Sequence, residues 1–331
     1  MNRTRIAING FGRIGRLALR QALTRTDVEV VAVNDLADNA SLAYLFSRDS
    51  VHGRYPGDVR LEGETLHVDE HAIKFTSNRD PKACNWGDMG IDVVLEATGV
   101  FLQRDRASLH LEAGAKRVLI SAPAQDPDIT LCLGVNDADF DAATHRIVSN
   151  ASCTTNCVAP VLKALHDAYG VEYGMLNTVH AYTMGQGLLD SPNKKYRRGR
   201  AAALNLVPTS TGAAKAVGLV IPELKGKLDG LAVRTPVPNG SLADLTLTLT
   251  GTPSEEEVLA TLREYAADYP SVLEVSSDEI VSSDILGDTH SSVVDATMTM
   301  AMGPMLKLLC WYDNEAGYAT RLVEMGVHIG S

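Results

Sequence analysis

The sequence is poor in aromatic residues and in cysteine. Phe, Trp and Tyr make up 5% of the 331 residues, whereas Ala, Val, Leu and Gly are abundant, a mixture typical of helices packed over a parallel sheet. The five cysteines are scattered, and they show neither a CxxC pair nor a Cys/His zinc spacing, so we expect no metal. So few cysteines also argue against a disulfide framework and favour a reducing, cytoplasmic compartment.

Two further absences narrow the functional class. No apolar run approaches ~20 residues, so we expect no transmembrane helix. The chain enters a strand by Arg5, which leaves no room for a signal peptide. Acidic residues outnumber basic residues by 41 to 30, a formal net charge of −11, which argues against a membrane partner and against a primary nucleic-acid role. The length allows about two domains.

A strand–turn–helix pattern opens the chain. It consists of a predicted strand over 5–9, a turn with Gly10, Gly12 and Gly15, a helix over 16–24, and a second strand over 29–34. The glycines would let a pyrophosphate approach the backbone at the helix N-terminus. Asp35 ends the second strand, where it would accept ribose hydroxyls and repel a 2′-phosphate, favouring NAD over NADP. A glycine turn without a ligand is the alternative.

Strands and helices continue to alternate through residue 150. We predict a helix over 40–49, hairpins over 51–75, strands over 92–97, 117–120 and 129–134, and a helix over 104–113. This order predicts a doubly wound parallel sheet, a Rossmann-type NAD-binding domain over 1–150. Thr98 and Gly99 follow a strand and would therefore lie near the cofactor. A last helix, about 317–331, is expected to pack back on this domain.

The stretch from Ala151 to Cys157 joins an apolar strand to a helix. Cys153 would lie near free backbone N–H groups, whose partial positive charge stabilises a thiolate. The hydroxyls of Ser152 and Thr154 could hold an anion at the same helix end. The alternative is a buried structural cysteine. A dinucleotide domain makes a redox thiol the better interpretation, because a thiolate can attack an aldehyde and hydride can then pass to a nicotinamide.

Residues 151–316 form a second, α+β domain in this interpretation. A strand leads to His180, a basic loop over 184–201 follows, and 208–215 is a hydroxyl-rich turn that enters a helix. We predict an antiparallel sheet from the alternation over 242–250 and the strands over 298–302 and 305–312, and a capping box from Ser254 and Glu257. The methionines over 298–305 are expected to fill gaps in the core.

Six motifs in order carry a family resemblance over almost the whole chain. They are INGFGRIGR (8–16), SNASCTTNC (149–157), HAYT (180–183), RRGRAAALNLVPTSTGAAKAVG (197–218), ELKGKLDGLAVRTPVP (223–238) and WYDNEAGY (311–318). The sequence resembles phosphorylating glyceraldehyde-3-phosphate dehydrogenase. The resemblance implies oxidative phosphorylation of a triose phosphate with NAD and inorganic phosphate, a homotetramer, and a loop after HAYT that reaches a neighbouring subunit.

The resemblance also implies residue roles. Cys153 would be the nucleophile and His180 its base. The attacking phosphate would be held by Ser152, Thr154, Thr211 and Gly212. The substrate phosphate would be held by Thr183 and Arg234, with Arg198 contributing to a phosphate site. NAD would be contacted by Gly10, Gly12, Arg13, Ile14, Gly15, Asp35, Arg79, Thr98, Gly99, Ser121, Asn314 and Tyr318.

Three positions depart from the family pattern. Ala316 stands where a Trp is usual, which predicts a loosely packed nicotinamide loop. Gly185 offers no side chain where an acid or Thr is frequent, and Ser191 stands where Leu is frequent and could relax the exclusion of NADP. Erythrose-4-phosphate dehydrogenase and a non-catalytic NAD-binding scaffold remain alternatives. A cysteine hydrolase is disfavoured because it would not use the glycine turn or Asp35.

Overall fold

The computed structural model describes residues 3–331, which divide into two compact units. The first unit comprises the described residues through Leu131 together with Asp137–Ala151 and Ala319–Ser331. The second comprises Cys132–Asn136 and Ser152–Tyr318. Within residues 3–331, none of the helices combines the length and the apolar character that a membrane span requires.

The first unit is built on a nine-stranded sheet. Its strand order is β10 (Ile129–Thr130), β11 (Ile147–Ser149), β9 (Arg117–Ile120), β8 (Val93–Glu96), β1 (Thr4–Asn9), β2 (Val28–Asn34), β7 (His71–Thr76), β6 (Thr65–Val68) and β5 (Val59–Glu62). All neighbours from β10 to β7 pair in parallel, and β5 and β6 form an antiparallel edge. The predicted doubly wound parallel sheet is therefore confirmed. The predicted hairpins form this edge of the sheet. Antiparallel strands can be joined by short turns, so β5, β6 and β7 follow one another without a helical crossover.

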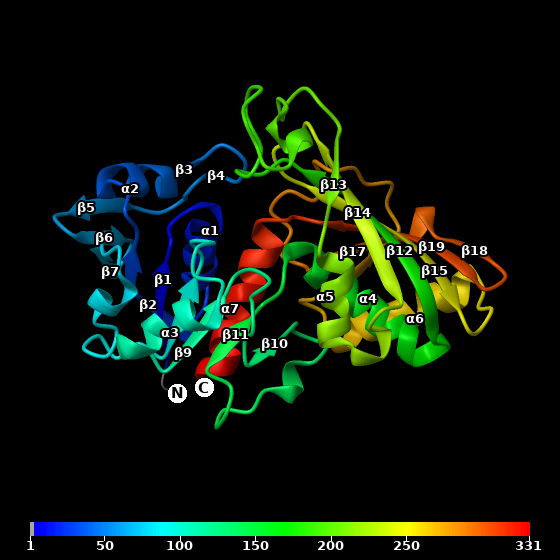
Figure 1. The fold of residues 1–331 in the computed structure, drawn as a ribbon, viewed down its shortest axis with the longest axis horizontal. Helices are drawn as coiled ribbons and strands as arrows, with labels where there is room; N and C mark the ends of the chain where they lie inside the picture. The colour runs from blue at the N-terminus through cyan, green and yellow to red at the C-terminus, as the bar shows by residue number, and fades with distance from the viewer. Residues whose placement is uncertain (1–2) are drawn as a thin grey trace. The chain divides into compact units, whose positions relative to one another are not determined.

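Four helices accompany this sheet. They are α1 (Arg13–Ala22), α2 (Asn39–Ser47), α3 (Arg104–Glu112) and the part of α7 (Ala316–Gly330) that belongs to this unit. Figure 1 shows α7 in red beside these strands, and an added Cβ at Gly326 would lie 3.2–3.3 Å from side chains of Leu95 and Ile6. Helix and sheet therefore meet closely where this glycine leaves room. A short ribbon pairs β3 (Arg48–Asp49) with β4 (Gly53–Arg54), and single 3₁₀ turns cover Pro81–Cys84 and Asp137–Asp139.

The second unit has an eight-stranded sheet. Its strand order is β13 (Val207–Ser210), β14 (Leu228–Thr235), β12 (Val171–Ala181), β15 (Ser241–Leu249), β19 (Met305–Tyr312), β17 (Ser292–Asp295) and β16 (Leu273–Ser276), with β18 (Met300–Met302) on β19. The sheet is mixed, because β12 pairs with β14, and β16 with β17, in parallel. The predicted antiparallel pairing is found between β13 and β14, β12 and β15, β15 and β19, and β17 and β19, whereas the two parallel pairs were not predicted. A helix between β12 and β14 permits the parallel pair.

One face of the second sheet is covered by α4 (Cys153–Tyr169), α5 (Ala213–Val220) and α6 (Glu255–Asp268), as Figure 1 shows. The predicted capping box of α6 is confirmed, with Ser254 and Glu257 bonded reciprocally. Three 3₁₀ turns cover Tyr196–Gly199, Pro222–Leu224 and Ala296–Met298. The expectation that the methionines fill the core is wrong. Met298, Met300, Met302 and Met305 are 51%, 54%, 70% and 46% exposed, because they lie on strands and turns whose outer face is not covered by any helix of residues 3–331.

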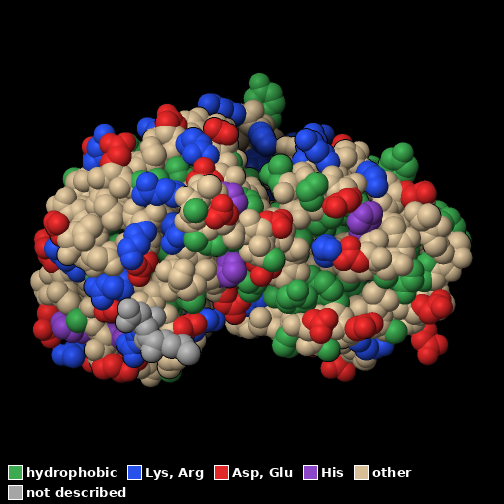
Figure 2. All heavy atoms as spheres, turned by 90° about the horizontal axis from the view of Figure 1, so that it is seen from below, with side chains coloured by type: hydrophobic (Ala, Val, Ile, Leu, Met, Phe, Trp, Pro, Cys, Tyr) green, Lys and Arg blue, Asp and Glu red, His purple; other side chains and the backbone are tan. Residues whose placement is uncertain are grey.

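Charged side chains are spread rather than gathered. Figure 2 shows acidic and basic groups interspersed over the face that it presents, although acids exceed bases in the sequence. Interspersed charge of this kind keeps a surface hydrated without forming one long-range field. The acidity therefore does not mark a binding surface on that face.

Candidate active site

Cys153 is the first residue of α4. Ser152 caps the helix by accepting a hydrogen bond from Thr155 N at 3.1 Å. Ala151, just before the cap, has φ +53°, a left-handed conformation that non-glycine residues rarely adopt. The sharp turn between β11 and α4 thus leaves Cys153 half-buried at the positive end of a seventeen-residue helix.

His180 lies opposite this thiol. It is the second-last residue of β12 and is buried, and its Nε2 lies 3.5 Å from the Sγ of Cys153. The structure thus brings together the two residues predicted to be catalytic, which are 27 positions apart. Tyr318 is buried near the same thiol, and burial raises its pKa well above the usual value, with the Cys153 charge adding to the effect.

Arg234 reaches the other side of the imidazole. The parallel register of β12 and β14 sets Arg234 directly beside His180. Its Nη1 lies 2.7 Å from His180 Nδ1 and donates to the Ala181 carbonyl at 2.9 Å. Arg234 Nε is buried and has no hydrogen-bond partner within residues 3–331. A guanidinium with a free buried donor is a place where an anion would be held.

Burial controls the titration of this pair. It raises the pKa of the Cys153 thiol, which Arg234 and Thr154 oppose. Burial, and then the charge of Arg234, lower the pKa of His180 to about 3. Both directions favour a neutral thiol beside a neutral imidazole, which suits His180 to accept a proton from the thiol. Burial therefore disfavours the predicted ion pair, in which a charged His180 would hold Cys153 as a thiolate.

The predicted phosphate ligands fall into two groups. Arg198 donates through Nε to Thr209 Oγ1 at 2.9 Å and thus lies on the turn that contains Thr211 and Gly212, and its charge also lowers the pKa of His180. Arg198 and Arg234 thus both place positive charge close enough to lower the pKa of His180. Thr154 is different, because its hydroxyl is buried 2.8 Å from that of Tyr312.

Thr183 lies in an exposed turn, where its N–H donates to Gln186 Oε1 at 3.2 Å. An added Cβ at Gly185 would meet only Thr183 Oγ1, at 3.9 Å. The structure therefore leaves room for a side chain at this position. Ser191 is exposed in the same loop.

The loop over 313–316 is held from within the second unit. Asp313 is buried and accepts hydrogen bonds from Asn239 Nδ2 and from the backbone N–H groups of Glu315 and Ala316, at 2.7–2.8 Å. Asn314 Oδ1 accepts from Ser241 Oγ at 2.7 Å. Ala316 is 2% exposed, and its N–H donates to the carboxylate of Asp313 that holds this loop. The small side chain fits a tightly bonded helix start.

The first unit contains a nucleotide-sized pocket at the carboxyl ends of β1, β2 and β8. Its volume is about 400 Å³, and it is lined by Asn9, Gly10, Gly12, Asn34, Asp35, Leu36, Asn78, Arg79, Pro81, Ala97, Thr98, Val100 and Phe101. Parallel sheets bind ligands at such a switch point, where neighbouring strands lead in opposite directions. Five of the residues predicted to contact the cofactor line this pocket, namely Gly10, Gly12, Asp35, Arg79 and Thr98.

The glycine turn fits a pyrophosphate. Gly12 is the N-cap of α1, offers no side-chain cap and has nothing within 4 Å of an added Cβ, so the backbone is open to a ligand. Asp35 is fixed by N–H groups of Phe11 and Ala37 at 2.7 and 2.9 Å. Arg13 forms an ion pair with Asp49 through its side chain.

Several predicted residues do not line this pocket. Arg13, Ile14, Gly15, Gly99 and Ser121 lie in or beside the same turns, whereas Asn314 and Tyr318 belong to the second unit. The sequence did not identify Asn9, Asn34 and Glu96, which end three neighbouring strands, as residues of the nucleotide site. It also did not identify Ser241 and Tyr312, which form hydrogen bonds with the predicted site residues Asn314 and Thr154. Asn9, Asn34 and Glu96 could have been found from the sequence, because each is a polar residue at the last position of an apolar strand.

Comparisons with known proteins agree with this picture. A dinucleotide-type sheet in one unit and a thiol–imidazole pair in the other define a nicotinamide-dependent oxidoreductase. A family model for the glyceraldehyde 3-phosphate dehydrogenase NAD binding domain matches residues 4–104, and one for the C-terminal domain matches 152–314. The chain belongs to the glyceraldehyde-3-phosphate dehydrogenase family, and NAD as its cofactor is confirmed.

Individual relatives match nearly end to end. Glyceraldehyde-3-phosphate dehydrogenase 1 of Bacillus subtilis (strain 168) is 52% identical over 327 residues, which cover 98% of both chains. The enzyme of Priestia megaterium is 51% identical over 329 residues, covering 99% of this chain and 98% of the relative. That of Geobacillus stearothermophilus is 50% identical with the same coverage. The family resemblance expected from the motifs is confirmed.

Proposed function

We propose that this chain oxidises D-glyceraldehyde 3-phosphate to 1,3-bisphosphoglycerate, with NAD as oxidant and inorganic phosphate as acyl acceptor. The observation that carries the proposal is the 3.5 Å approach of His180 Nε2 to Cys153 Sγ at the start of α4, with Arg234 beside it. The near end-to-end identity to named glyceraldehyde-3-phosphate dehydrogenases supports the substrate class.

The first half of the reaction forms a bond to sulfur. His180 accepts the thiol proton as Cys153 Sγ attacks the aldehyde carbon, and then returns this proton to the former carbonyl oxygen, which gives a hemithioacetal. Gly10, Gly12 and Asp35 would help to hold NAD, which would supply the hydride acceptor for that carbon. His180 takes the hydroxyl proton as the hydride leaves, and a thioester on Cys153 remains. Arg234, with its free buried Nε, is proposed to hold a phosphate group during these steps.

The second half releases the acyl group. A phosphate oxygen attacks the thioester carbon, the C–S bond breaks, and Cys153 leaves as a thiolate while the acyl phosphate departs. We assign the attacking phosphate to the turn with Thr211 and Gly212, at the N-terminus of α5, and to Ser152 at the N-terminus of α4. Arg198 lies on the first of these turns. Thr154 takes part only if its hydroxyl turns away from Tyr312.

The deciding experiment is a rate assay with D-glyceraldehyde 3-phosphate, NAD and phosphate. We expect NADH formation that stops after one turnover when phosphate is omitted. Phosphate-independent turnover with erythrose 4-phosphate would instead favour the sister dehydrogenase. A catalytically silent protein whose Cys153 resists alkylation would favour the NAD-binding scaffold.

The uncovered face of the second sheet supports the proposed homotetramer. Tyr173, Met175, Met300 and Met302 are 54–70% exposed on β12 and β18, and such a cluster of large apolar side chains is typical of a protein–protein interface. A second copy would bury it. Five free cysteines, four of them buried, fit the proposed reducing cytoplasm, which fractionation of expressing cells would check.

A further inference from the structure

Three buried polar residues end three neighbouring strands of the first sheet. Asn9 closes β1, Asn34 closes β2 and Glu96 closes β8, and the parallel register sets Asn9 directly beside each of the other two. Their exposed fractions are 2%, 4% and 0%. Buried polar groups are costly unless they are bonded, so this row is held in place by its hydrogen bonds.

Glu96 is the main hydrogen-bond acceptor of this row. Its Oε2 accepts hydrogen bonds from Asn9 Nδ2 at 2.5 Å and lies 3.1 Å from His110 Nε2. Its Oε1 accepts from the backbone N–H of Thr98 at 2.9 Å and from the hydroxyl of the same residue. A carboxylate is an acceptor only, and here it faces donors on every side. Asn34 Nδ2 extends the network to Asn9 Oδ1 at 2.8 Å.

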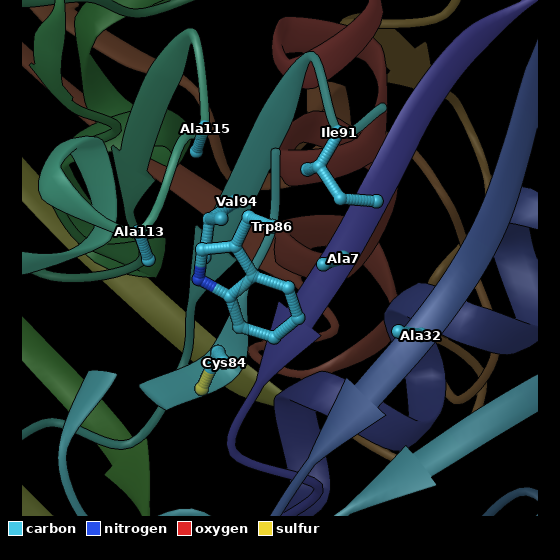
Figure 3. Packing of buried hydrophobic residues seen from close by; sticks show 8 residues of the cluster. All are labelled: Ala7, Ala32, Cys84, Trp86, Ile91, Val94, Ala113 and Ala115. Carbon is cyan, nitrogen blue, oxygen red and sulfur yellow. The ribbon is translucent and has the colours of Figure 1, made fainter. Parts of the chain in front are cut away.

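The protein core fixes the orientation of His110. Trp86 Nε1 lies 3.0 Å from His110 Nδ1, and because the indole can only donate, Nδ1 accepts and Nε2–H points to Glu96. Trp86 is fully buried in the cluster drawn in Figure 3, among residues that include Ala7 and Val94. The indole cannot move without disturbing that packing. Glu96 is thus tied to the core on one side.

On its other side the network forms the wall of the nucleotide pocket. Asn9, Asn34 and Thr98 all line that pocket, whereas His110 and Trp86 do not. An added Cβ at Gly10 would lie 2.7 Å from Thr98 N, so the glycine turn and the Thr98 turn are in close contact. The hydrogen bonds from Thr98 to Glu96 therefore determine where the backbone behind Gly10 lies.

We propose that Glu96 is a positioning residue of the nucleotide site, which holds the glycine turn and the Thr98 turn at the spacing that the dinucleotide requires. It acts through Asn9 and Thr98 and does not itself line the pocket. The inference deepens the proposed function and depends on it only for the identity of the nucleotide, NAD.

The test is NAD binding by Glu96→Gln. The amide has one acceptor oxygen where the carboxylate has two, so its NH₂ group must face a donor, either Thr98 or the Asn9–His110 side. We expect the NAD dissociation constant, measured by calorimetry, to rise on the order of tenfold. We expect kcat at saturating NAD to stay within about twofold while KM for NAD rises. A merely structural role would not give this split.

The matched control is Asp128→Asn. Asp128 also accepts backbone N–H groups in the first unit, from Arg146 and Ile147 at 2.8 and 2.7 Å, but it lies outside the nucleotide pocket. We expect this variant to lose stability and to keep its affinity for NAD. Equal affinities in the parent, Glu96→Gln and Asp128→Asn would overturn the inference. A parent that does not bind NAD would count against the proposed function instead.

A second variant covers the case in which Glu96→Gln does not fold. Trp86→Phe keeps an aromatic ring in the core and removes the donor that fixes His110. The imidazole can then turn an acceptor towards Glu96. We expect a rise of a few-fold in the NAD dissociation constant, with a native circular dichroism spectrum. A folded Trp86→Phe protein with unchanged NAD affinity would also overturn the inference.

Discussion

Arg234 Nη1 lies 2.7 Å from Nδ1 of His180, on the side of the imidazole away from Cys153. Nδ1 also lies 2.7 Å from the Ala181 carbonyl, which can only accept, so a neutral His180 carries its proton on Nδ1 and keeps Nε2 free to accept a proton from Cys153. Arg234 donates to the same carbonyl at 2.9 Å and places a positive charge next to a ring that must accept a proton. Arg234 therefore lowers the basicity of His180, in addition to holding any phosphate.

Replacement of Arg234 by Leu is expected to raise the pKa of His180 from about 3, because it removes the neighbouring cation. The loss of a charged donor is also expected to lower kcat/KM for the triose phosphate roughly 100-fold. Titration of the histidine ring signals by NMR, with His180→Asn to assign the signal, would measure the first effect. Arg200→Leu is the control, because Arg200 forms an exposed ion pair with Asp190. An unmoved His180 titration would contradict the assignment.

Ser241 connects the end of β12, which carries His180, to the loop that carries Asn314. Its hydroxyl donates to Asn314 Oδ1 at 2.7 Å and accepts from Ala181 N at 3.2 Å. Because Oδ1 of Asn314 is thus occupied, its NH₂ group is left for the proposed nicotinamide contact. Ser241→Ala is expected to lower kcat/KM for NAD roughly tenfold, equivalent to about 1.4 kcal/mol.

Ser291→Ala is the matched control for that change. Ser291 is also a buried serine, but its hydroxyl has no hydrogen-bond partner in the described part of the chain. Steady-state kinetics with varied NAD would compare the two variants. If both lose the same activity, the effect of Ser241→Ala comes from packing and not from the orientation of Asn314.

The sequence was sufficient to predict the first sheet, because its strands are apolar and each is followed by a residue that marks its end, such as Gly10 or Asp35. The strand expected over 129–134 stops at Thr130. Beyond it, Asn136 Oδ1 accepts from Cys132 N at 2.9 Å and turns the chain. An apolar run cannot reveal a side chain that closes a loop four residues later. Element boundaries of this kind depend on local hydrogen bonds.

The second unit was harder to predict because its contacts are non-local. Alternation places Met298, Met300 and Met302 on one face but does not tell which face a helix covers. The motifs identified Cys153 and His180. The contact between His180 and Arg234, which are 54 residues apart, depends on the parallel register of β12 and β14 and could not be predicted from them. The role of Glu96 was not predicted, because a single acidic residue at the end of a strand is also typical of the start of an exposed loop.

A pH-dependent contribution to stability is expected from His290. The structure places its Nδ1 2.8 Å from Asp288 Oδ1, with Glu274 nearby and Nε2 against the Pro270 carbonyl at 3.0 Å. The hydrogen bond to Asp288 raises the pKa of His290 above 6.5. The folded state thus binds this proton more tightly than the unfolded state. The resulting stability is fully present below the unfolded pKa and is lost as pH rises through the folded pKa.

We therefore expect His290→Asn to destabilise the protein more at about pH 6 than at about pH 8.5, as measured by urea unfolding. Asp288→Asn should remove most of this pH dependence, because Asp288 is the main cause of the shift. Parallel stability curves for the parent and His290→Asn across this range would show that His290 gains no proton affinity on folding.

Charge placed on the uncovered sheet face should weaken the proposed assembly. Met175 and Met302 are 65% and 70% exposed, and a glutamate at either position would have to be desolvated when a second copy covers the face, which costs several kcal/mol per ion. We expect Met175→Glu and Met302→Glu to shift the mass measured by light scattering towards a smaller species. Val281→Glu, at a 57% exposed loop position, is the control and should leave the mass unchanged. If all three variants keep the parent mass, another surface must join the subunits, and the exposed methionines would need a different explanation.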